Sequence, residues 1–556
     1  MKSIVKTNYR LLFYTCWFVL GLLQSSATEL IDDEAYYWVY SKFLSWGYFD
    51  HPPMVALLIK IGYAVFQNEL GVRLMSVLLS TCTIFIVESL IEKKNFFLFA
   101  SIVISVGFLQ LGGILAVPDT PLLFFTALFF WIYKKYVADI SYKNAFGFGL
   151  IIALLFYSKY HGLLVLVFSL LSNLRLLRYK QTWFIFLCVL FFYTPHLFWQ
   201  TENDWVSFRY HLFESNVNTY KFSYTTDYIL GQLLLTGPLI GFLLLPAAFF
   251  YSTQNKTEKA LKFTMVGFYL FFLLNTFRGR VEPNWTAPVL ISVIVLSHQF
   301  LLANTGFNKT IKWLTAVSLF IIVFVRIYLI IDIGPDNKIK SRFHHHKIWA
   351  ESIVKKTKNF SVVFYNSYQR ASMFWFYSGN PSHALNNYRE RKNNYNFWPT
   401  ETDLLGAPVF VADIYNVHRF PDSITTKKGW VGLRFDSSFS ALGKIQIRLR
   451  QNIIEVNNPD SIELLYNLSV PKITVDFLKK QPALKTELVV GVFGGKILVE
   501  EIQTGITAHQ LLFAQPKIFV SLKNVARGNY FLRVGIKTKN YPPTQNSEKI
   551  KLIVKK

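Results

Sequence analysis

The chain has 556 residues, of which 52% are hydrophobic, and its mean hydropathy is +0.31. This composition excludes an ordinary soluble protein and is typical of a multi-pass membrane protein with a soluble part. The net charge of +25 could suit nucleic acid, but many basic residues occupy loops between apolar segments, so we expect no nucleic-acid partner. Only three cysteines occur, all in apolar segments, which argues against a disulfide framework or a Cys-based metal site.

Apolar segments follow one another through the first ~335 residues. Residues 53–68 are apolar but short and contain Lys60, which predicts an amphipathic helix on the outer membrane surface. The first apolar segment is expected to stay in the membrane, with cleavage near QSSAT at 24–28 as the alternative. The pattern predicts about eleven transmembrane helices, some short enough to be broken or tilted: residues 11–27, 73–91, 95–113, 119–137, 144–157, 161–175, 182–198, 231–251, 261–277, 285–303 and 313–333.

The loops between these segments fall into two classes. One class is rich in lysine and arginine, and the other carries the acids and most rarer polar residues. Because basic loops stay in the cytoplasm, the N-terminus is expected inside and the C-terminal part outside. The loops that carry the acids and the rarer polar residues, and that could therefore support catalysis, then all face the outer side.

The composition changes after Ile333. Residues 336–402 mix a helix-like start with one strand and polar aromatic loops, which predicts an α/β segment. Residues 403–556 show period-two alternation with Gly, Asn and Pro punctuation, which predicts a β-sandwich-like domain. We expect residues 1–335 to be the membrane domain that carries the chemistry.

Acidic residues occur in two of the loops that are expected on the outer side. Asp33 and Glu34 follow the first span directly, where a solvated helix start is the alternative interpretation. Asp119 lies between two prolines at the mouth of another span, where an unpaired acid would be costly. A helix N-cap is the alternative role for Asp119.

Basic residues mark the remaining loops. His51 precedes two prolines near the headgroup level, and Lys159 interrupts an apolar stretch, where a buried ammonium needs an anion. Arg278 and Arg280 suit phosphate recognition by guanidinium forks, with membrane-anchoring side chains as the alternative. Further polar residues in the same loops are candidates for a substrate groove: Tyr36, His161, Asp204, Glu282 and Asn284.

These acidic and basic motifs, taken together in their order along the chain, are more informative than any one of them. They supply two separated acids, several fixed cations and a groove at the membrane surface. A reaction that needs these parts is displacement at a sugar carbon with a lipid-linked phosphate as leaving group. A carboxylate would act as general base, and cations or a metal would stabilise charge on the phosphate.

The same motifs resemble the GT-C superfamily of polyprenyl-phosphate-sugar-dependent glycosyltransferases. The nearest groups are bacterial relatives of protein O-mannosyltransferases and of the lipid A aminoarabinose and core galacturonic acid transferases. The resemblance covers the membrane part and continues to residue 381. It is carried by DEAYYW at 33–38, GYFDHPP at 47–53, GVRLMSVLL at 71–79, PDTPL at 118–122, SKYHGLL at 158–164, FWQTENDWVSFRY at 198–210 and EPNWTAP at 282–288.

The resemblance implies an inverting transfer on the periplasmic side of a bacterial inner membrane. It implies that Asp33, in the acid pair with Glu34, is the catalytic aspartate and that Asp119 is the second family acid. The residue before the tandem proline is often a lysine that meets the donor phosphate, but here it is His51. This departure leaves Lys159, Arg278 and Arg280 as candidate phosphate ligands. A divalent metal is possible, although no ligand spacing demands a cofactor.

The expected partners are a polyprenyl-phosphate-sugar donor, the bilayer, and a glycan, lipid or protein acceptor. A transporter or flippase for a lipid-linked glycan is the main alternative. It should place ionisable residues near the membrane midplane and show repeated halves, whereas this chain clusters them at span ends. A non-catalytic scaffold would not need the acids and Lys159 where they are. The C-terminal part could bind the acceptor or cover the groove.

Overall fold

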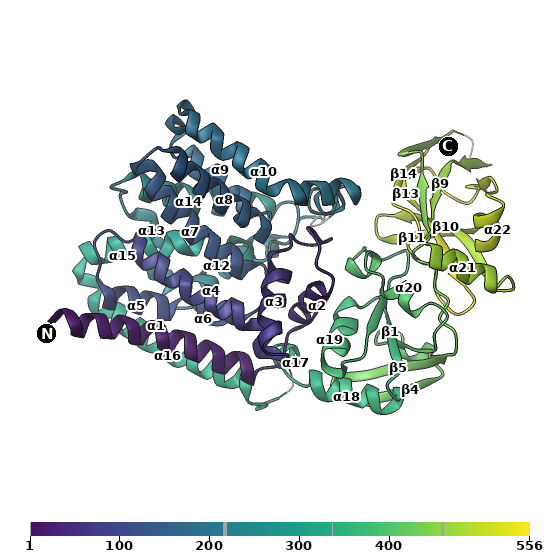
Figure 1. The fold of residues 1–556 in the computed structure, drawn as a ribbon, viewed down its shortest axis with the longest axis horizontal. Coiled ribbons are helices and arrows are strands. Elements are labelled where there is room, and N and C mark those ends of the chain that lie inside the picture. The colour runs from purple at the N-terminus through teal and green to yellow at the C-terminus, as the bar shows by residue number, and fades with distance from the viewer. Residues whose placement is uncertain (1, 215–218, 336, 458–460, 556) are drawn as a thin grey trace. The chain divides into compact units, whose positions relative to one another are not determined.

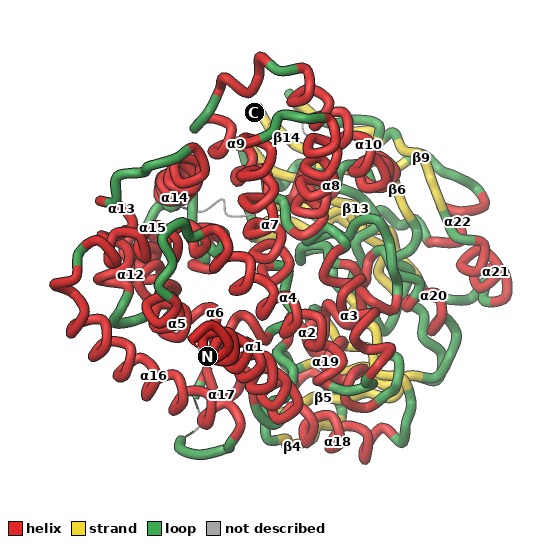
Figure 2. Tube along the Cα trace, turned by 60° about the vertical axis from the view of Figure 1, so that its left-hand side comes forward, coloured by secondary structure: helices red, strands yellow, loops and turns green. Residues whose placement is uncertain are grey.

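The protein is described by a computed structural model that covers residues 2–214, 219–335, 337–457 and 461–555. The chain divides into two compact units, Met1–His344 and His345–Lys556 (Figure 1). Helices make up the first unit, and the strands all belong to the second (Figure 2). The expected combination of a helical membrane part with a C-terminal β-containing region is confirmed.

Each predicted apolar segment overlaps at least one helix of the first unit, but the predicted spans 95–113 and 231–251 are each divided between two helices. The helices of this unit are α1 (Lys2–Ala27), α2 (Asp32–Lys42), α3 (Met54–Val65), α4 (Glu69–Leu90), α5 (Phe96–Ser105), α6 (Gly107–Leu111), α7 (Asp119–Ala138), α8 (Tyr142–Ser158), α9 (Gly162–Leu171), α10 (Lys180–Glu202), α11 (Val206–Arg209), α12 (Phe222–Thr236), α13 (Gly241–Phe250), α14 (Lys256–Asn275), α15 (Val289–Ala303), α16 (Asn308–Ile330) and α17 (Lys338–Phe343).

Length and composition mark a subset of these helices as candidate membrane spans. Within the described ranges, three are long and apolar enough to cross alone, and up to six crossings result if each bent helix pair is one span. Other apolar helices, including α8, α9 and α15, have only 10–17 residues. The protein is therefore multi-pass, while the count of about eleven spans stays a prediction.

Two of the bent pairs show why some apolar segments are short. α12 and α13 meet at 95°, where Gly237 has a φ of +139° that suits glycine and Pro238 follows. α1 and α2 meet at 92°, because three carboxylates at the start of α2 are incompatible with hydrocarbon. α2 therefore turns away from the direction of α1 at the point where the acids begin.

α15 forms the centre of the helical core. Every residue from Val289 to Gln299 is buried, as expected of a helix that is apolar on all sides. α7, α8 and α10 pack beside one another, with Phe129, Tyr133 and Phe148 in aromatic contact. This core holds the helix ends that carry the polar loops.

The second unit begins with helix α18 (His346–Thr357) and a five-stranded sheet in the order β2-β1-β3-β5-β4. β1 pairs in parallel with β2 on one side and β3 on the other, and β5 is antiparallel to β3 and β4. α19 (Tyr368–Ser378) connects β1 to β2. The sheet extends past the expected boundary at residue 402: β1 (Ser361–Tyr365), β2 (Ser382–Leu385), β3 (Val409–Asp413), β4 (Asp422–Thr426) and β5 (Gly429–Asp436).

A second five-stranded sheet follows in the order β11-β10-β13-β14-β7. Leu488, Val490 and Val492 alternate along β10 and face a core that includes Ile518 and Leu464 from short strands. The opposite face of β10 is buried as well, with Phe493 packed on Tyr388. The strands are β6 (Gln446–Leu449), β7 (Ile453–Val456), β8 (Ile462–Leu464), β9 (Tyr466–Ser469), β10 (Thr486–Gly494), β11 (Ile497–Gln503), β12 (Ile518–Val520), β13 (Gly528–Thr538) and β14 (Ile550–Val554).

Candidate functional site

Glu34 and Arg73 form a fully buried ion pair between α2 and α4. Arg73 Nη2 donates to Glu34 Oε2 at 2.6 Å and its Nε donates to Oε1 at 2.8 Å, a two-bond fork. Both side chains are 0% exposed. The same guanidinium donates to the backbone oxygens of Thr28 and Glu29 at 2.8 and 2.9 Å. Arg73 therefore fixes the turn between α1 and α2, and its charge makes the burial of Glu34 possible.

Glu34 also ties α2 to the segment that precedes α7. Its Oε1 accepts a hydrogen bond from the backbone NH of Ala116 at 2.9 Å, and its Oε2 accepts from Ile31 NH at 3.1 Å. Ala116 lies three positions before Asp119. Both carboxylate oxygens of Glu34 are thus occupied, and their bonds place the two predicted acidic segments side by side.

Asp33 differs from its neighbour Glu34. Its side chain is half-buried, and no described residue donates a hydrogen bond or forms an ion pair to its carboxylate. Burial raises the pKa of Asp33 to about 6, with further contributions from the charges of Asp32 and Asp50 and opposition from Arg342. A carboxylate with this pKa can accept and release a proton near neutral pH.

The second acid, Asp119, lies in a buried cluster drawn from three separate segments. Lys159 Nζ donates to Asp119 Oδ1 at 2.7 Å, and Asn284 Nδ2 donates to Asp119 Oδ2 at 3.0 Å. Asp119 is the first residue of α7, Lys159 directly follows α8, and Asn284 belongs to the short turn Pro283–Thr286. The buried ammonium at 159 does have the anion that the sequence required.

Asp50 and His51 lie in the loop Gly47–Pro53, which contacts the tyrosines of α2. The hydroxyls of Tyr36 and Tyr40 donate to Asp50 Oδ2 at 3.2 and 3.3 Å, and His211 Nε2 donates to the backbone oxygen of Asp50 at 2.8 Å. The His51 ring lies 5.7 Å from that of Tyr37. Tyr36 and His51, both predicted site residues, therefore converge on one loop.

The end of α10 and the adjoining α11 hold this loop in place. Ser207 Oγ, from α11, donates to Tyr48 O at 2.8 Å, and His196 Nδ1, from α10, donates to Trp46 O at 2.7 Å. Gly47 allows the approach, because a Cβ there would lie 2.3 Å from Trp199 Cε3. Gln200 Nε2 donates to the hydroxyl of Tyr160, next to Lys159, at 3.1 Å. One scaffold thus positions the loops of both His51 and Lys159.

His161 lies beside the lysine cluster, between the rings of Phe272 and Trp285 at 5.2 and 5.6 Å. Its Nδ1 is buried and has no hydrogen-bond partner among the described residues. Trp285 follows Asn284 directly, so the turn at 283–286 supplies both an amide for Asp119 and a wall for His161. The two predicted groove residues His161 and Asn284 are therefore neighbours in space.

Three predicted site residues, Arg278, Arg280 and Glu282, are not brought into this cluster by any contact among the described residues. Arg280 and Glu282 are exposed and pair with each other at 3.2 Å. Arg278 is exposed, with one contact of 3.4 Å to the backbone oxygen of Leu212. Asp204 is exposed and has a φ of +54°. Part of the loop 196–227, in which Asp204 lies, falls outside the described residues at 215–218.

Some residues of the site were not assigned a role from the sequence. Arg73 is one, although a single arginine inside an apolar helix is a signal that could have found it. Tyr40 and His211 are others, and nothing local distinguishes them from ordinary interfacial aromatic residues. Among the described residues, no group of three His, Cys, Asp or Glu side chains is placed to hold a metal ion.

Comparison with known proteins gives three similarities. Residues 50–199 match the family model described as dolichyl-phosphate-mannose-protein mannosyltransferase. The lipid A galacturonosyltransferase RgtD of Rhizobium johnstonii is 23% identical over 309 residues, which are 51% of this chain and 63% of RgtD. The chain therefore spans less than two thirds of that relative.

Solved structures of ArnT from Cupriavidus metallidurans share the fold. The apo structure has a TM-score of 0.56 at 11% identity, covering 78% of this chain and 99% of ArnT. The structure bound to undecaprenyl phosphate has a TM-score of 0.55 at 12% identity with the same coverage. The relatives of this chain are thus glycosyltransferases of the GT-C type, as the sequence motifs predicted.

Proposed function

We propose that the chain is an integral membrane glycosyltransferase that moves a sugar from a polyprenyl-phosphate-linked donor to an envelope acceptor. The transfer takes place on the periplasmic face of a bacterial inner membrane, with the N-terminus in the cytoplasm and the C-terminal unit in the periplasm. The acceptor is lipid A, core oligosaccharide, another glycan or a protein.

One observation carries this proposal. The carboxylate of Asp33, which no described residue pairs with, is held next to the segment of Asp119 by the bonds of Glu34 to Arg73 and Ala116. Asp119 in turn holds the buried ammonium of Lys159. A proton acceptor and a fixed cation therefore lie on adjoining segments. Direct displacement of a phosphate from a sugar needs this pair of groups.

Asp33 is the proposed catalytic base. Its ionised carboxylate takes the proton from an acceptor hydroxyl while that oxygen bonds to the anomeric carbon of the donor sugar. The bond from this carbon to the phosphate oxygen breaks at the same time, and polyprenyl phosphate leaves with the electron pair. A single displacement inverts the anomeric configuration.

The cations stabilise the departing phosphate. Lys159 has three N–H donors, of which Asp119 engages one in the structure, so the others can face phosphate oxygens. His51 is the second proposed phosphate ligand. We assign Asp119, Asn284 and Glu34 as positioning residues, because their polar atoms are engaged with protein groups.

The remaining predicted residues fit the edges of the same site. Tyr36 and His161 would line the sugar groove beside Asp50 and Trp285. Arg278, Arg280, Asp204 and Glu282 are exposed, so we place them at the rim, where they would act on approaching lipid or acceptor. A divalent metal is not needed for the step as written.

The relatives support the choice of donor and acceptor classes. The ArnT structure was obtained with undecaprenyl phosphate, and RgtD is named as a lipid A galacturonosyltransferase. The first names a polyprenyl phosphate as a ligand, and the second joins sugar transfer to lipid A.

The test is sugar transfer by the full chain in lipid nanodiscs with synthetic polyprenyl-phosphate-sugars and lipid A or core acceptors. Asp33→Asn should lower turnover at least 100-fold while leaving the melting temperature unchanged. Asp227→Asn is the matched control, since Asp227 is exposed and has no described partner. Wild-type turnover by Asp33→Asn, or equal losses in both variants, would refute the role of Asp33.

A further inference from the structure

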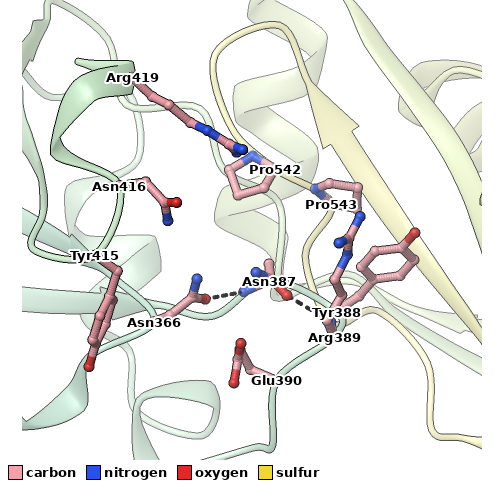
Figure 3. Close-up of a pocket in the computed structure, with 10 residues that line it drawn as sticks. All are labelled: Asn366, Asn387, Tyr388, Arg389, Glu390, Tyr415, Asn416, Arg419, Pro542 and Pro543. Carbon is pink, nitrogen blue, oxygen red and sulfur yellow. Dashed lines mark hydrogen bonds between the residues drawn. The ribbon is translucent and has the colours of Figure 1, made fainter. Parts of the chain in front are cut away.

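A polar cavity lies within the second unit, and none of its lining residues is assigned to sugar transfer. Its volume is about 590 Å³, which is within the range of small-molecule sites. Figure 3 shows Asn366, Asn416, Arg419 and Glu390 arranged around it. Tyr415 stands on one side, and Pro542 and Pro543 close the other.

The topology of the first sheet explains why a cavity forms here. Asn366 directly follows β1, Asn387 lies two residues after β2, and Tyr415 lies two residues after β3. β2 and β3 pair with opposite edges of β1, so the loops after these parallel strands separate. Ligands of open α/β sheets bind at this switch point, outside the carboxyl ends of the strands.

The walls of the cavity are held rigidly by hydrogen bonds. Asn366 Oδ1 accepts from Asn387 NH at 2.9 Å, and Asn387 Oδ1 accepts from Arg389 NH at 2.8 Å (Figure 3). Tyr388 NH donates to Pro543 O at 2.8 Å. Asn366 has a φ of +53°, a conformation that is retained where the surroundings enforce it. A preformed wall lowers the entropic cost of binding.

The third loop is shaped in the same way. Asp413 Oδ1, at the end of β3, accepts from the backbone NH groups of Tyr415 and Asn416 at 2.7 and 3.1 Å. The turn leaves Tyr415 62% exposed beside the cavity. An exposed aromatic ring on a fixed backbone turn can stack on the apolar face of a sugar ring.

The charges of the cavity select an anion. Arg389 and Arg419 both line it, both are exposed, and neither has a carboxylate partner within the described part of the chain. Glu390 is the single acid in the lining. Guanidinium forks match carboxylate and phosphate oxygens, while the amides of Asn366 and Asn416 and the carboxylate of Glu390 suit hydroxyl groups.

We propose that this cavity binds an anionic saccharide, a sugar unit that bears a phosphate or a carboxylate. The anion would lie against Arg389 and Arg419, and the sugar hydroxyls would meet the asparagine amides and Glu390. The proposal does not depend on sugar transfer, because none of these residues belongs to the membrane site.

The experiment is calorimetric titration of the full chain in lipid nanodiscs with four probes: glucose 1-phosphate, glucuronate, glucose and inorganic phosphate. One of the two anionic sugars should bind at least tenfold more tightly than glucose or inorganic phosphate, and which one binds identifies the anion. Arg389→Ala and Arg419→Ala should each weaken binding about tenfold, and the double variant should abolish it. Tyr415→Ala should weaken both anionic sugars but not inorganic phosphate.

Three control variants show whether the bound sugar occupies this cavity. Arg527→Ala removes an exposed arginine of the same unit that has no described partner, and it should leave binding unchanged. Asp33→Asn and the charge-balanced double variant Lys159→Met/Asp119→Asn should also retain binding, even where transfer is lost. Binding that survives the Arg389→Ala/Arg419→Ala double variant, or that is lost in a folded Lys159→Met/Asp119→Asn protein, overturns the proposal. Equal affinity for inorganic phosphate and glucose 1-phosphate, or no saturable binding at about millimolar concentration, also overturns it.

Discussion

Three adjacent carboxylates at the start of α2 illustrate how neighbouring residues of one type acquire different properties. Glu34 is enclosed by Arg73 and two backbone NH groups, whereas Asp33 has no such partner among the described residues. The sequence alone could locate the acid cluster but could not separate these roles, because Arg73 is 39 positions from Glu34. The long-range pairing of Glu34 with Arg73, rather than any local sequence pattern, determines that Asp33 is the carboxylate available as a base.

The raised pKa of Asp33 predicts the pH dependence of transfer. With a pKa of about 6, the carboxylate is protonated below this pH and cannot accept the acceptor's proton, so activity is lost as pH falls. We expect kcat/KM to be about tenfold lower at pH 5 than at pH 7 and to level off above pH 7. Rate measurements across this range check it.

Asp32→Asn provides the matched test of this assignment. The charge of Asp32 raises the pKa of Asp33, so its removal should move the midpoint of the pH profile to lower pH. An unchanged midpoint, or one that moves upward, would show that another group titrates.

Lys159 allows a separation of donor binding from folding. Lys159→Met leaves Asp119 buried without its cation, which should destabilise the protein by about 3–5 kcal/mol. The double variant Lys159→Met/Asp119→Asn removes both charges and should regain most of this stability. If Lys159 binds the donor phosphate, the double variant should still show a donor KM raised at least tenfold. Thermal unfolding and donor titration measure the two effects, and a normal donor KM would contradict the assignment.

At the scale of elements, the sequence predicted most helices and strands because their patterns are local. Period-two alternation located β10 and β13, and apolar runs located α7 and α16. The break between α5 and α6 was not predictable, since residues 95–113 are apolar on both sides of a 75° bend. The first sheet was divided at residue 402 because its strands β1 and β3 pair across 48 positions, from Ser361 to Val409, which no local pattern reveals.

The Glu34–Arg73 pair predicts how α1, α2 and α4 depend on one another. Arg73→Leu leaves Glu34 buried without its cation, and it also removes the donors that hold Thr28 O and Glu29 O. We expect a loss of about 3–5 kcal/mol in unfolding free energy and a loss of transfer through displacement of Asp33. Arg209→Leu, which removes a half-buried arginine outside these helices, is the comparison variant. Denaturation in detergent measures both, and unaltered stability of Arg73→Leu would contradict this role.

At the scale of the whole molecule, the separation of charges between loops predicts the orientation in the membrane. Lys143 lies exposed in the first turn of α8, at a basic loop, and Glu202 lies exposed at the end of α10 near the proposed site. In a protein whose three native cysteines are replaced by serine, Glu202→Cys should react with a membrane-impermeant thiol reagent in spheroplasts. Lys143→Cys should react only after lysis, because basic loops stay in the cytoplasm. Arg527→Cys, in the second unit, should behave like Glu202→Cys. The reverse pattern would place the Asp33 and Lys159 loops in the cytoplasm and exclude transfer to a periplasmic acceptor.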